Sequence, residues 1–295
     1  MKKREGLIMK KIIALILCLV MVLSFTVLFA SCGEQKAKVK VYTEYELTAE
    51  SYAFAVAKEN TDLKEAANEL LTDLGTSGKL DDIINSFYDG SSTFSYENPV
   101  HTVPSGDDRE NYLIVATHAS FPPFENNEGK KFFGIDMNIA YLLAEKLGKT
   151  LYINNMDFDA VIASVKNGES DIGMSGITIN EARLELVDFT TEYYESAQVL
   201  ITREDDSVFA DCKSAEDVER ALKKQGKDFI VGVQKGTTGF MYTAGDDDGY
   251  EGFENVATKP YSTGSLAVLD LANGKINAVI IDKQPAILFA KTANE

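Results

Sequence analysis

The sequence predicts an α/β fold made of two lobes. From Tyr112 to Glu295, short apolar runs alternate regularly with amphipathic segments, which is the pattern of strand–helix–strand units that build a mostly parallel sheet. The alternation is interrupted once, near Ala197–Thr202, and then resumes. The chain has 295 residues, of which 45% are apolar, and this is enough for one large or two medium hydrophobic cores.

The first residues predict secretion. Met1–Lys11 is basic, Ile12–Ala30 is an unbroken apolar run, and small residues precede Cys32. These are the features of a signal peptide, although an apolar run of this length could also span a bilayer as a retained anchor. The residues directly before Cys32 resemble the lipobox of bacterial lipoproteins, with Phe29 in place of the usual leucine. This resemblance implies cleavage and lipidation at Cys32.

Composition excludes several classes of function. The net charge of −17 disfavours binding to nucleic acid or to anionic lipid. Only Cys212 would remain as a thiol once Cys18 is removed and Cys32 is lipidated, so we expect no intramolecular disulfide. The two histidines, His101 and His118, form no cluster with cysteine. We therefore expect no metal site and no cofactor.

The part of the chain before Tyr112 predicts two strands, two helices and a linker. Val39–Val41 alternates like a short strand, and Ser51–Ala57 is an apolar run of strand length. A helix begins at Thr61-Asp62 and ends at Gly75, and a second helix covers Leu80–Phe87. Asp89–Glu110 is rich in Ser, Gly, Asp and Pro without periodicity, which is typical of a linker.

After Tyr112 each predicted helix ends at a turn signal such as Gly148, Asn167-Gly168 or Asn273-Gly274. The predicted strands are Tyr112–Thr117, Leu151–Asn155, Asp171–Ser175, Ala197–Thr202, Phe229–Val233, Val256–Tyr261 and Ile276–Asp282. The predicted helices are Met137–Leu147, Phe158–Lys166, Ala215–Lys224, a short one near Thr238–Tyr242, Ser265–Ala272 and Pro285–Lys291.

One stretch, Gly173–Arg183, combines a small-residue turn with a helix start. Thr178 and Glu181 match the Thr-x-x-Glu capping pattern, so we expect free backbone N–H groups near the guanidinium of Arg183. Together they would bind a carboxylate. The alternative is an ordinary capped surface helix in which Arg183 pairs with a neighbouring Glu.

Polar residues follow several predicted strands. In open α/β sheets, ligands bind beyond the carboxyl ends of the strands, and the residues at these ends are His118, Ser175, Thr237, Thr238 and Asp282. One lobe would supply the cation of Arg183 and the other the carboxylate of Asp282. Opposite charges on facing lobes are complementary to a zwitterion, so the sequence predicts an α-amino acid ligand.

Several motifs in order resemble solute-binding protein family 3, the amino-acid-binding components of ABC importers. They are Leu113–Glu125, Gly134-Ile-Asp-Met, Met156-Asp-Phe-Asp, Ser175–Arg183, Val187-Asp-Phe-Thr-Thr-Glu-Tyr-Tyr, Gly236-Thr-Thr-Gly and Ile281-Asp282. The resemblance implies the type II, two-lobe (Venus-flytrap) periplasmic-binding fold. It stops short of the family's usual carboxyl end, and Lys38–Gly90 resembles that missing end.

We therefore expect a circular permutation; the alternative is an unrelated amino-terminal domain joined to a truncated protein. The resulting division is 1–31 signal peptide, 32–45 tether and strand of the second lobe, 46–88 permuted carboxyl-terminal part of the first lobe, 89–111 linker, 112–196 main part of the first lobe, and 197–295 crossover strand and second lobe. Under this hypothesis Ser51–Phe87 packs on the lobe that holds Tyr112–Asp188.

The resemblance also implies a role for each site residue. Arg183 and the N–H groups of Thr178 and Thr238 would hold the ligand carboxylate. Asp282, the Gly176 carbonyl and the Ser175 hydroxyl would receive the ammonium, with Thr237 beside them. Phe121 and Phe158 would enclose the side chain, unless they are ordinary core aromatics. His118 stands where members that bind cationic side chains often have an acid, which implies a polar or neutral ligand, and Gln234 is a weaker selector.

These observations predict a monomeric lipoprotein on the extracytoplasmic face of the cell membrane that passes its ligand to the membrane permease of an ABC importer. We expect no catalysis. The resembling fold also includes periplasmic dehydratases, but the candidate site has no obvious pair of groups tuned as acid and base. A ligand-sensing receptor domain is the second alternative.

Overall fold

The computed structural model describes residues 36–246 and 249–295. The expected signal peptide and the expected lipidation site at Cys32 lie outside the described residues. Within the described part of the chain, no helix is both long enough and apolar enough to cross a membrane.

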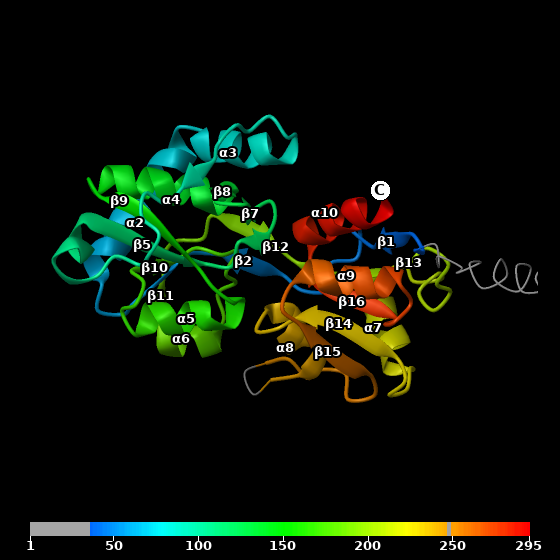
Figure 1. The fold of residues 1–295 in the computed structure, drawn as a ribbon. Coiled ribbons are helices and arrows are strands. Elements are labelled where there is room, and N and C mark those ends of the chain that lie inside the picture. The colour runs from blue at the N-terminus through cyan, green and yellow to red at the C-terminus, as the bar shows by residue number, and fades with distance from the viewer. Residues whose placement is uncertain (1–35, 247–248) are drawn as a thin grey trace, which may run out of the picture. The chain divides into compact units, whose positions relative to one another are not determined.

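The first lobe is built on a five-stranded sheet of order β11-β3-β10-β5-β9 (Figure 1). Its strands are β3 (Ala55–Val56), β5 (Tyr112–Thr117), β9 (Thr150–Asn155), β10 (Ile172–Gly173) and β11 (Asp188–Phe189). Its helices are α2 (Thr61–Thr76), α3 (Lys79–Tyr88), α4 (Ile135–Lys146), α5 (Phe158–Lys166) and α6 (Glu181–Leu186). Alternate residues of β5 face opposite sides, as the period of a strand requires: Val115 packs in the core beneath α2 and α4, whereas Ala116 packs with Val161 of α5.

The second lobe is built on a sheet of order β1-β13-β16-β14-β15. Its strands are β1 (Val39–Val41), β13 (Gln198–Arg203), β14 (Ile230–Gln234), β15 (Ala257–Tyr261) and β16 (Ala278–Asp282). Its helices are α7 (Ala215–Lys223), α8 (Thr238–Ala244), α9 (Gly264–Ala272) and α10 (Lys283–Asn294). Helices α9 and α10 cover one face through Leu271 and Phe289, while Val218 of α7 belongs to the core on the other.

Both sheets are mixed, which corrects the expectation of mostly parallel sheets. Strand β5 is parallel to β9 and β10, but β3 is antiparallel to β10 and β11. In the second lobe β14 is parallel to β15 and β16, whereas β13 is antiparallel to β1 and β16. The antiparallel members are the strands that adjoin the connections between the lobes, and these are not strand–helix–strand units.

Two connections run between the lobes and pair with each other. Strand β2 (Glu50–Tyr52) is antiparallel to β12 (Tyr194–Ser196). β2 follows the segment that leaves β1 in the second lobe, and β12 precedes β13. The two connections therefore form a two-stranded ribbon between the lobes.

The amino-terminal segment completes both lobes. Leu63, Leu71 and Leu74 of α2 share a core with Leu143 of α4, so Ser51–Phe87 packs on the first lobe as expected. In the second lobe, the side chain of Asn294 accepts a hydrogen bond from Val39 N at 2.8 Å and donates one to Val39 O at 2.9 Å. This places β1 beside the last helix. The permutation itself stays a prediction.

The expected linker is more ordered than its composition indicated. Strand β4 (Tyr96–Glu97) joins a second sheet of the first lobe with β8 (Lys131–Phe133), β7 (Glu125–Glu128) and β6 (Ser120–Phe121), and a 3-10 helix covers Gly106–Asn111. The Asn98 amide both donates to Ile153 O and accepts from Ile153 N, each at 2.8 Å. Strand β7 was missed because it is polar throughout, and β8 because its three residues are too few to show an apolar alternation.

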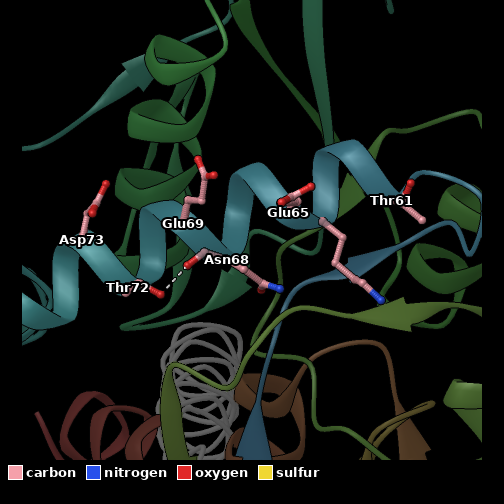
Figure 2. A pocket seen from close by; sticks show the side chains of 7 residues that line it. Thr61, Glu65, Asn68, Glu69, Thr72 and Asp73 are labelled. Carbon is pink, nitrogen blue, oxygen red and sulfur yellow. Dashed lines mark hydrogen bonds between the residues drawn. The ribbon is translucent and has the colours of Figure 1, made fainter.

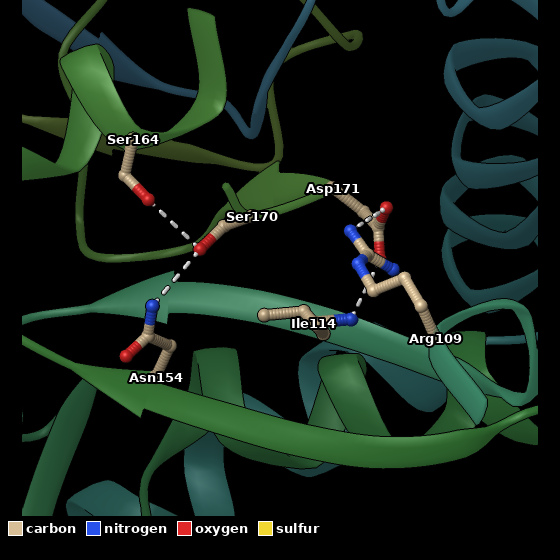
Figure 3. Close-up of polar contacts among 6 residues, drawn as sticks. All are labelled: Arg109, Ile114, Asn154, Ser164, Ser170 and Asp171. Atoms are coloured by element: carbon tan, nitrogen blue, oxygen red, sulfur yellow. Dashed lines mark hydrogen bonds and ion pairs between the residues drawn. The ribbon is translucent and has the colours of Figure 1, made fainter. Parts of the chain in front are cut away.

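Half-buried and buried polar side chains fix the start of β10 against β5. Asp171 accepts from Ile114 N at 2.7 Å and pairs with both terminal nitrogens of Arg109, at 2.6 and 3.0 Å (Figure 3). The neighbouring Ser170 hydroxyl receives hydrogen bonds from Ser164 and from the Asn154 amide. These contacts set the register of the strand whose carboxyl end carries Ser175 and Gly176.

Candidate functional site

Arg183 is a buried side chain of the first lobe, with 5% of its surface exposed. Its Nη1 donates to Thr178 O at 2.6 Å, and its Nη2 donates across the lobes to Gly236 O at 3.1 Å. The guanidinium carbon lies 5.5 Å from the centre of the Phe158 ring, a cation–π distance. Arg183 is therefore not the surface ion-pair partner of the alternative interpretation.

The start of helix α6 differs from the expectation. The helix begins at Glu181, and its cap is Asn180, whose side chain accepts from Arg183 N at 2.9 Å. The predicted Thr178 cap is wrong because Thr178 instead forms a β-bridge with Tyr52. The flanking hydrogen bonds run from Ala53 N to Ile177 O and from Ile179 N to Ser51 O. In this type of bridge the N–H of the central residue points away from the partner strand, so Thr178 N–H is available to a ligand.

The loop after β10 is held from behind by two buried carboxylates. Gly176 adopts a φ of +52° and its N–H donates to Asp136 at 2.9 Å; a side chain at this position would also meet the Phe121 ring at 3.0 Å. The Ser175 hydroxyl donates to Glu125 at 2.9 Å and accepts from His118 N at 2.9 Å. Burial raises the pKa of Glu125 well above its ordinary value and that of Asp136 to about 7.

The second lobe contributes the end of β14, the start of α8 and the end of β16. Thr237 caps α8 by accepting from Phe240 N at 3.3 Å. Thr238 and Asp282 are 2% and 3% exposed. Asp282 accepts a hydrogen bond from the Tyr52 hydroxyl. Burial, followed by the charge of Glu50, raises the pKa of Asp282 to about 7.

These residues converge on one small cavity of about 10 Å³. Its walls come from both lobes: Phe121, Phe158, Gly176, Thr178, Arg183, Gln234, Thr237, Thr238 and Asp282. All nine belong to the set that the sequence singled out. Ser175 and His118 are not among the residues lining it: the Ser175 hydroxyl is engaged by Glu125, and the His118 ring contacts Met156 O through Nδ1 at 3.0 Å.

The lobes also touch beside the cavity. Lys235 of the second lobe lies 2.6 Å from Asp159 of α5 in an ion pair, and the Asn180 amide is 3.5 Å from the sulfur of Met241. With Arg183 donating to Gly236 O, these contacts join the two lobes next to residues that line the cavity. A volume of about 10 Å³ accommodates roughly one water molecule. The walls must therefore separate to admit an amino acid.

Sequence reasoning missed Glu50 and Tyr52, which come from the amino-terminal segment. Glu50 is 7% exposed and accepts hydrogen bonds from the hydroxyls of Thr178 at 2.7 Å and Thr238 at 2.8 Å. Tyr52 is fully buried and donates to Asp282. A charged residue beginning an otherwise apolar run, two positions before a Tyr on the same face of a strand, was the available signal.

A larger hollow lies elsewhere, along the outer face of α2 (Figure 2). It measures about 660 Å³ and is lined by Thr61, Lys64, Glu65, Asn68, Glu69, Thr72 and Asp73. Lys64 pairs with Asp188 at 2.6 Å, and Asn68 accepts from Thr191 N at 2.8 Å. These side chains tie α2 to the segment after α6, and none of the predicted site residues lines this hollow.

Similarity to known proteins identifies the family of the chain. The model of the bacterial extracellular solute-binding proteins, family 3, matches residues 113–277, more than half of the chain. The chain belongs to this family. The resemblance seen in the sequence is therefore confirmed, as is the two-lobe α/β fold.

Individual relatives of this family 3 member are binding proteins. The arginine-binding periplasmic protein of Mannheimia haemolytica is 30% identical over 170 residues, which are 57% of this chain and 62% of that protein. The chain thus spans less than two thirds of that relative's length. The ancestral amino-acid-binding protein AncCDT-1, a precursor of cyclohexadienyl dehydratase, is 28% identical with a TM-score of 0.54, covering 63% of this chain and 76% of that one. An ancestral arginine-binding protein bound to glutamine is 32% identical with a TM-score of 0.51, covering 62% and 74%.

Proposed function

We propose that this protein binds an α-amino acid with a polar or neutral side chain between its two lobes and delivers it to the permease of an ABC importer. The observation that carries this proposal is the convergence of Arg183 and Asp282, from opposite lobes, on one small cavity. A guanidinium and a carboxylate at two ends of one cavity complement the two charges of a zwitterion.

The ligand carboxylate would replace the backbone contacts of Arg183. Its Nη1 and Nη2 now donate to two carbonyls, on Thr178 and Gly236, and a carboxylate is the stronger acceptor for a guanidinium fork. The N–H groups of Thr178 and Thr238 would add donors. At the other end, the ammonium would bind Asp282 and the Gly176 carbonyl, with Thr237 nearby. Phe121 and Phe158 would contact the side chain.

Two buried polar atoms support a polar, uncharged side chain. The Gln234 amide oxygen accepts from Gly264 N at 3.1 Å, while its nitrogen has no partner among the described residues. The His118 Nδ1 must donate to the carbonyl of Met156, which leaves Nε2 as an acceptor in the neutral ring, also without a partner in that part of the chain. Gln234 lines the cavity, and its unpaired donor complements the carbonyl oxygen of a carboxamide such as that of glutamine. His118 does not line the cavity in this closed arrangement, so its acceptor would take part only once the cavity widens around a ligand.

Arginine is the second candidate. The curated relatives include several named as arginine-binding proteins. In this chain, the carboxylates of Glu50 and Asp282 flank the single guanidinium of Arg183, so a ligand with a net positive charge would balance the site when both are ionised.

Isothermal titration calorimetry with glutamine, arginine and the other common amino acids tests the proposal. We expect the tightest binding for a polar or neutral amino acid, with loss of at least a hundredfold in affinity for Arg183→Ala, because a charge-assisted fork is removed. Arg220→Ala is the matched control, since Arg220 is an exposed arginine that pairs with Asp217. Undiminished binding by Arg183→Ala contradicts the mechanism, and preference for arginine establishes the second candidate.

Delivery to a permease requires the extracytoplasmic location that we propose, with a lipid anchor at Cys32 and a monomeric binding protein. The family assignment supports secretion. Mass spectrometry of the amino-terminal peptide and release of Cys32→Ala into the medium test the anchor. Ligand-dependent stimulation of the partner ATPase tests transport against a sensing role.

We propose binding without catalysis, although AncCDT-1 is described as a precursor of a dehydratase. The carboxylates nearest the cavity are already engaged: Asp282 by Tyr52, and Glu50 by two threonine hydroxyls. Incubation with arogenate-like substrates, followed by chromatography, decides the point. Turnover above the uncatalysed rate would establish the enzyme instead.

The circular permutation is also a proposal. The family match ends at residue 277 and begins at 113, while residues 39–88 supply strands and helices to both lobes. A rearranged chain that starts at Tyr112, continues through Glu295 and joins directly to residues 37–88 should fold and keep its ligand affinity. Failure of that chain to fold would favour an independent origin of the first segment.

A further inference from the structure

Glu50 occupies an unusual place for a carboxylate, on the ribbon between the lobes and within reach of both. Its Oε2 accepts from Thr178 of the first lobe at 2.7 Å and from Thr238 of the second lobe at 2.8 Å, and its Oε1 accepts from Thr48 at 2.7 Å. We propose that Glu50 is a clasp: a positioning residue that holds the lobes together through Thr178 and Thr238 and so favours the closed arrangement before ligand binds. This inference rests on the proposed amino-acid-binding function.

The clasp is joined to both connections of the ribbon. Thr238 donates its hydroxyl proton to Glu50 and accepts a hydrogen bond from Gln198 Nε2 at 3.0 Å. Glu50 begins β2, and Gln198 begins β13 directly after the second connection. The Thr238 hydroxyl therefore acts both as a donor and as an acceptor. These two hydrogen bonds fix the rotamer of its side chain and the position of the first turn of α8.

The same contacts place the donors expected to bind the ligand carboxylate. Glu50 engages the hydroxyls of Thr178 and Thr238, not their backbone N–H groups. The Thr178 N–H points away from β2 because of the bridge to Tyr52. One carboxylate oxygen thus brings a donor from each lobe to the same end of the cavity as Arg183.

The charges around Arg183 also support the clasp. Arg183 is buried, and no carboxylate oxygen of the described residues lies within ion-pair distance of it. Burial lowers the pKa of Arg183. Among the charges that oppose this shift, Glu50 has the largest effect, followed by Asp282. The clasp therefore offsets part of the cost of burying a cation in the closed arrangement. Opening separates Thr178 from Thr238, so Glu50 must release at least one of them.

The test measures the lobe-to-lobe distance without ligand. Spin labels at Asn167 and Lys224, exposed residues that follow α5 and α7, report this distance by pulsed electron spin resonance once the native cysteines are replaced by serine. Glu50→Ala and Thr238→Val should raise the open-to-closed ratio by about tenfold or more, because each removes at least one hydrogen bond to a charged group. Glu50→Gln, which keeps an acceptor oxygen, should lie between these variants and the wild type.

Thr48→Val is the matched control, because it removes a hydrogen bond to Glu50 that involves neither Thr178 nor Thr238. The same substitution removes the acceptor of Gln198 N, a contact of 2.9 Å at the start of β13 that does not reach the first lobe. The distance distribution of Thr48→Val should equal that of the wild type. Distances unchanged in both Glu50→Ala and Thr238→Val would overturn the clasp, and so would an equal shift in Thr48→Val. Calorimetry on the wild type is read separately: absence of amino-acid binding defeats the proposed function, whereas the ligand-free distances judge the clasp alone.

Discussion

Ligand affinity should depend on pH through Asp282. This carboxyl is 3% exposed, and burial, with a further contribution from Glu50, raises its pKa to about 7, against the opposing effect of the hydrogen bond from Tyr52. A ligand ammonium beside Asp282 favours the ionised form. Binding must therefore release the proton that the ligand-free carboxyl carries.

The magnitude follows from the pKa of about 7. The ionised fraction of such a group is about 0.9 at pH 8 and about 0.1 at pH 6. The dissociation constant should therefore rise about tenfold between these values, equivalent to about 1.4 kcal/mol. The direction of the pH dependence follows because the pKa of Asp282 is higher without ligand than with ligand bound. Ligand affinity is therefore full above pH 7 and is lost as the pH falls through 7.

Calorimetric titration at pH 6, 7 and 8 measures this dependence. At pH 7, titrations in two buffers of different ionisation enthalpy should show about half a proton released per ligand bound. Other titratable or charged groups act on Asp282 or lie close behind the site: Glu50, Tyr52, Glu125, Asp136, Arg183, Tyr250 and His118. Two variants distinguish the contribution of Asp282 to the pH dependence from the contributions of these other groups. Asp282→Asn should bind more weakly with a flat pH profile, and His118→Gln should keep the slope.

A wild-type affinity that is constant from pH 6 to 8 would refute this reasoning. So would a slope that persists in Asp282→Asn, because the proton would then come from another group. Proton uptake on binding, instead of release, would place the ammonium away from Asp282.

Three further predictions concern the fork, the packing of the amino-terminal segment and a buried acid. Arg183→Lys keeps the charge but loses the planar fork, so calorimetry should show affinity about tenfold to a hundredfold weaker; equal affinity would exclude bidentate binding. Leu71→Ala removes a side chain that is 5% exposed in the shared core of α2 and α4. It should lower the free energy of unfolding, measured by urea denaturation, by about 2–5 kcal/mol. The exposed control Thr72→Ala should change this free energy by less than about 0.5 kcal/mol. Asp136 has a folded pKa of about 7 against an ordinary 3.8, so its proton stabilises the folded state increasingly as pH falls from 7 to 5, by at most about 1.4 kcal/mol per pH unit. Asp136→Asn should lose this pH-dependent contribution to the free energy of unfolding. Urea unfolding curves that are the same for the wild type and Asp136→Asn at each pH would contradict the prediction.

The sequence by itself determined most of the longer elements and most of the cavity wall. Period-2 and period-3.6 patterns depend on local burial, so β5, β9, α5 and α7 lie within one or two residues of their predicted bounds. Polar residues after apolar strands located Asp282 and Thr238, because the carboxyl ends of strands are where an open sheet leaves room for a ligand. The spacing of these residues along the chain was sufficient for that inference.

Tertiary structure alone decided which polar groups are engaged. Thr178 looked like a helix cap, but the bridge to Tyr52, 126 residues earlier in the chain, takes it out of the helix and leaves Asn180 as the cap. Ser175 looked like a ligand contact, but its hydroxyl is used by Glu125 behind the loop. Such choices depend on contacts between distant segments, which a local pattern does not encode.

The role of the amino-terminal segment shows the same division. Its composition predicted strands and helices, and its resemblance predicted where they pack, yet neither indicated that Glu50 would reach both lobes. That position follows from the pairing of β2 with β12 and from the meeting of Thr178 and Thr238 at one carboxylate oxygen. The sequence determined which residues could bind a zwitterion, and the fold decided which of them face the cavity, because only the packed chain settles where each hydrogen bond is made.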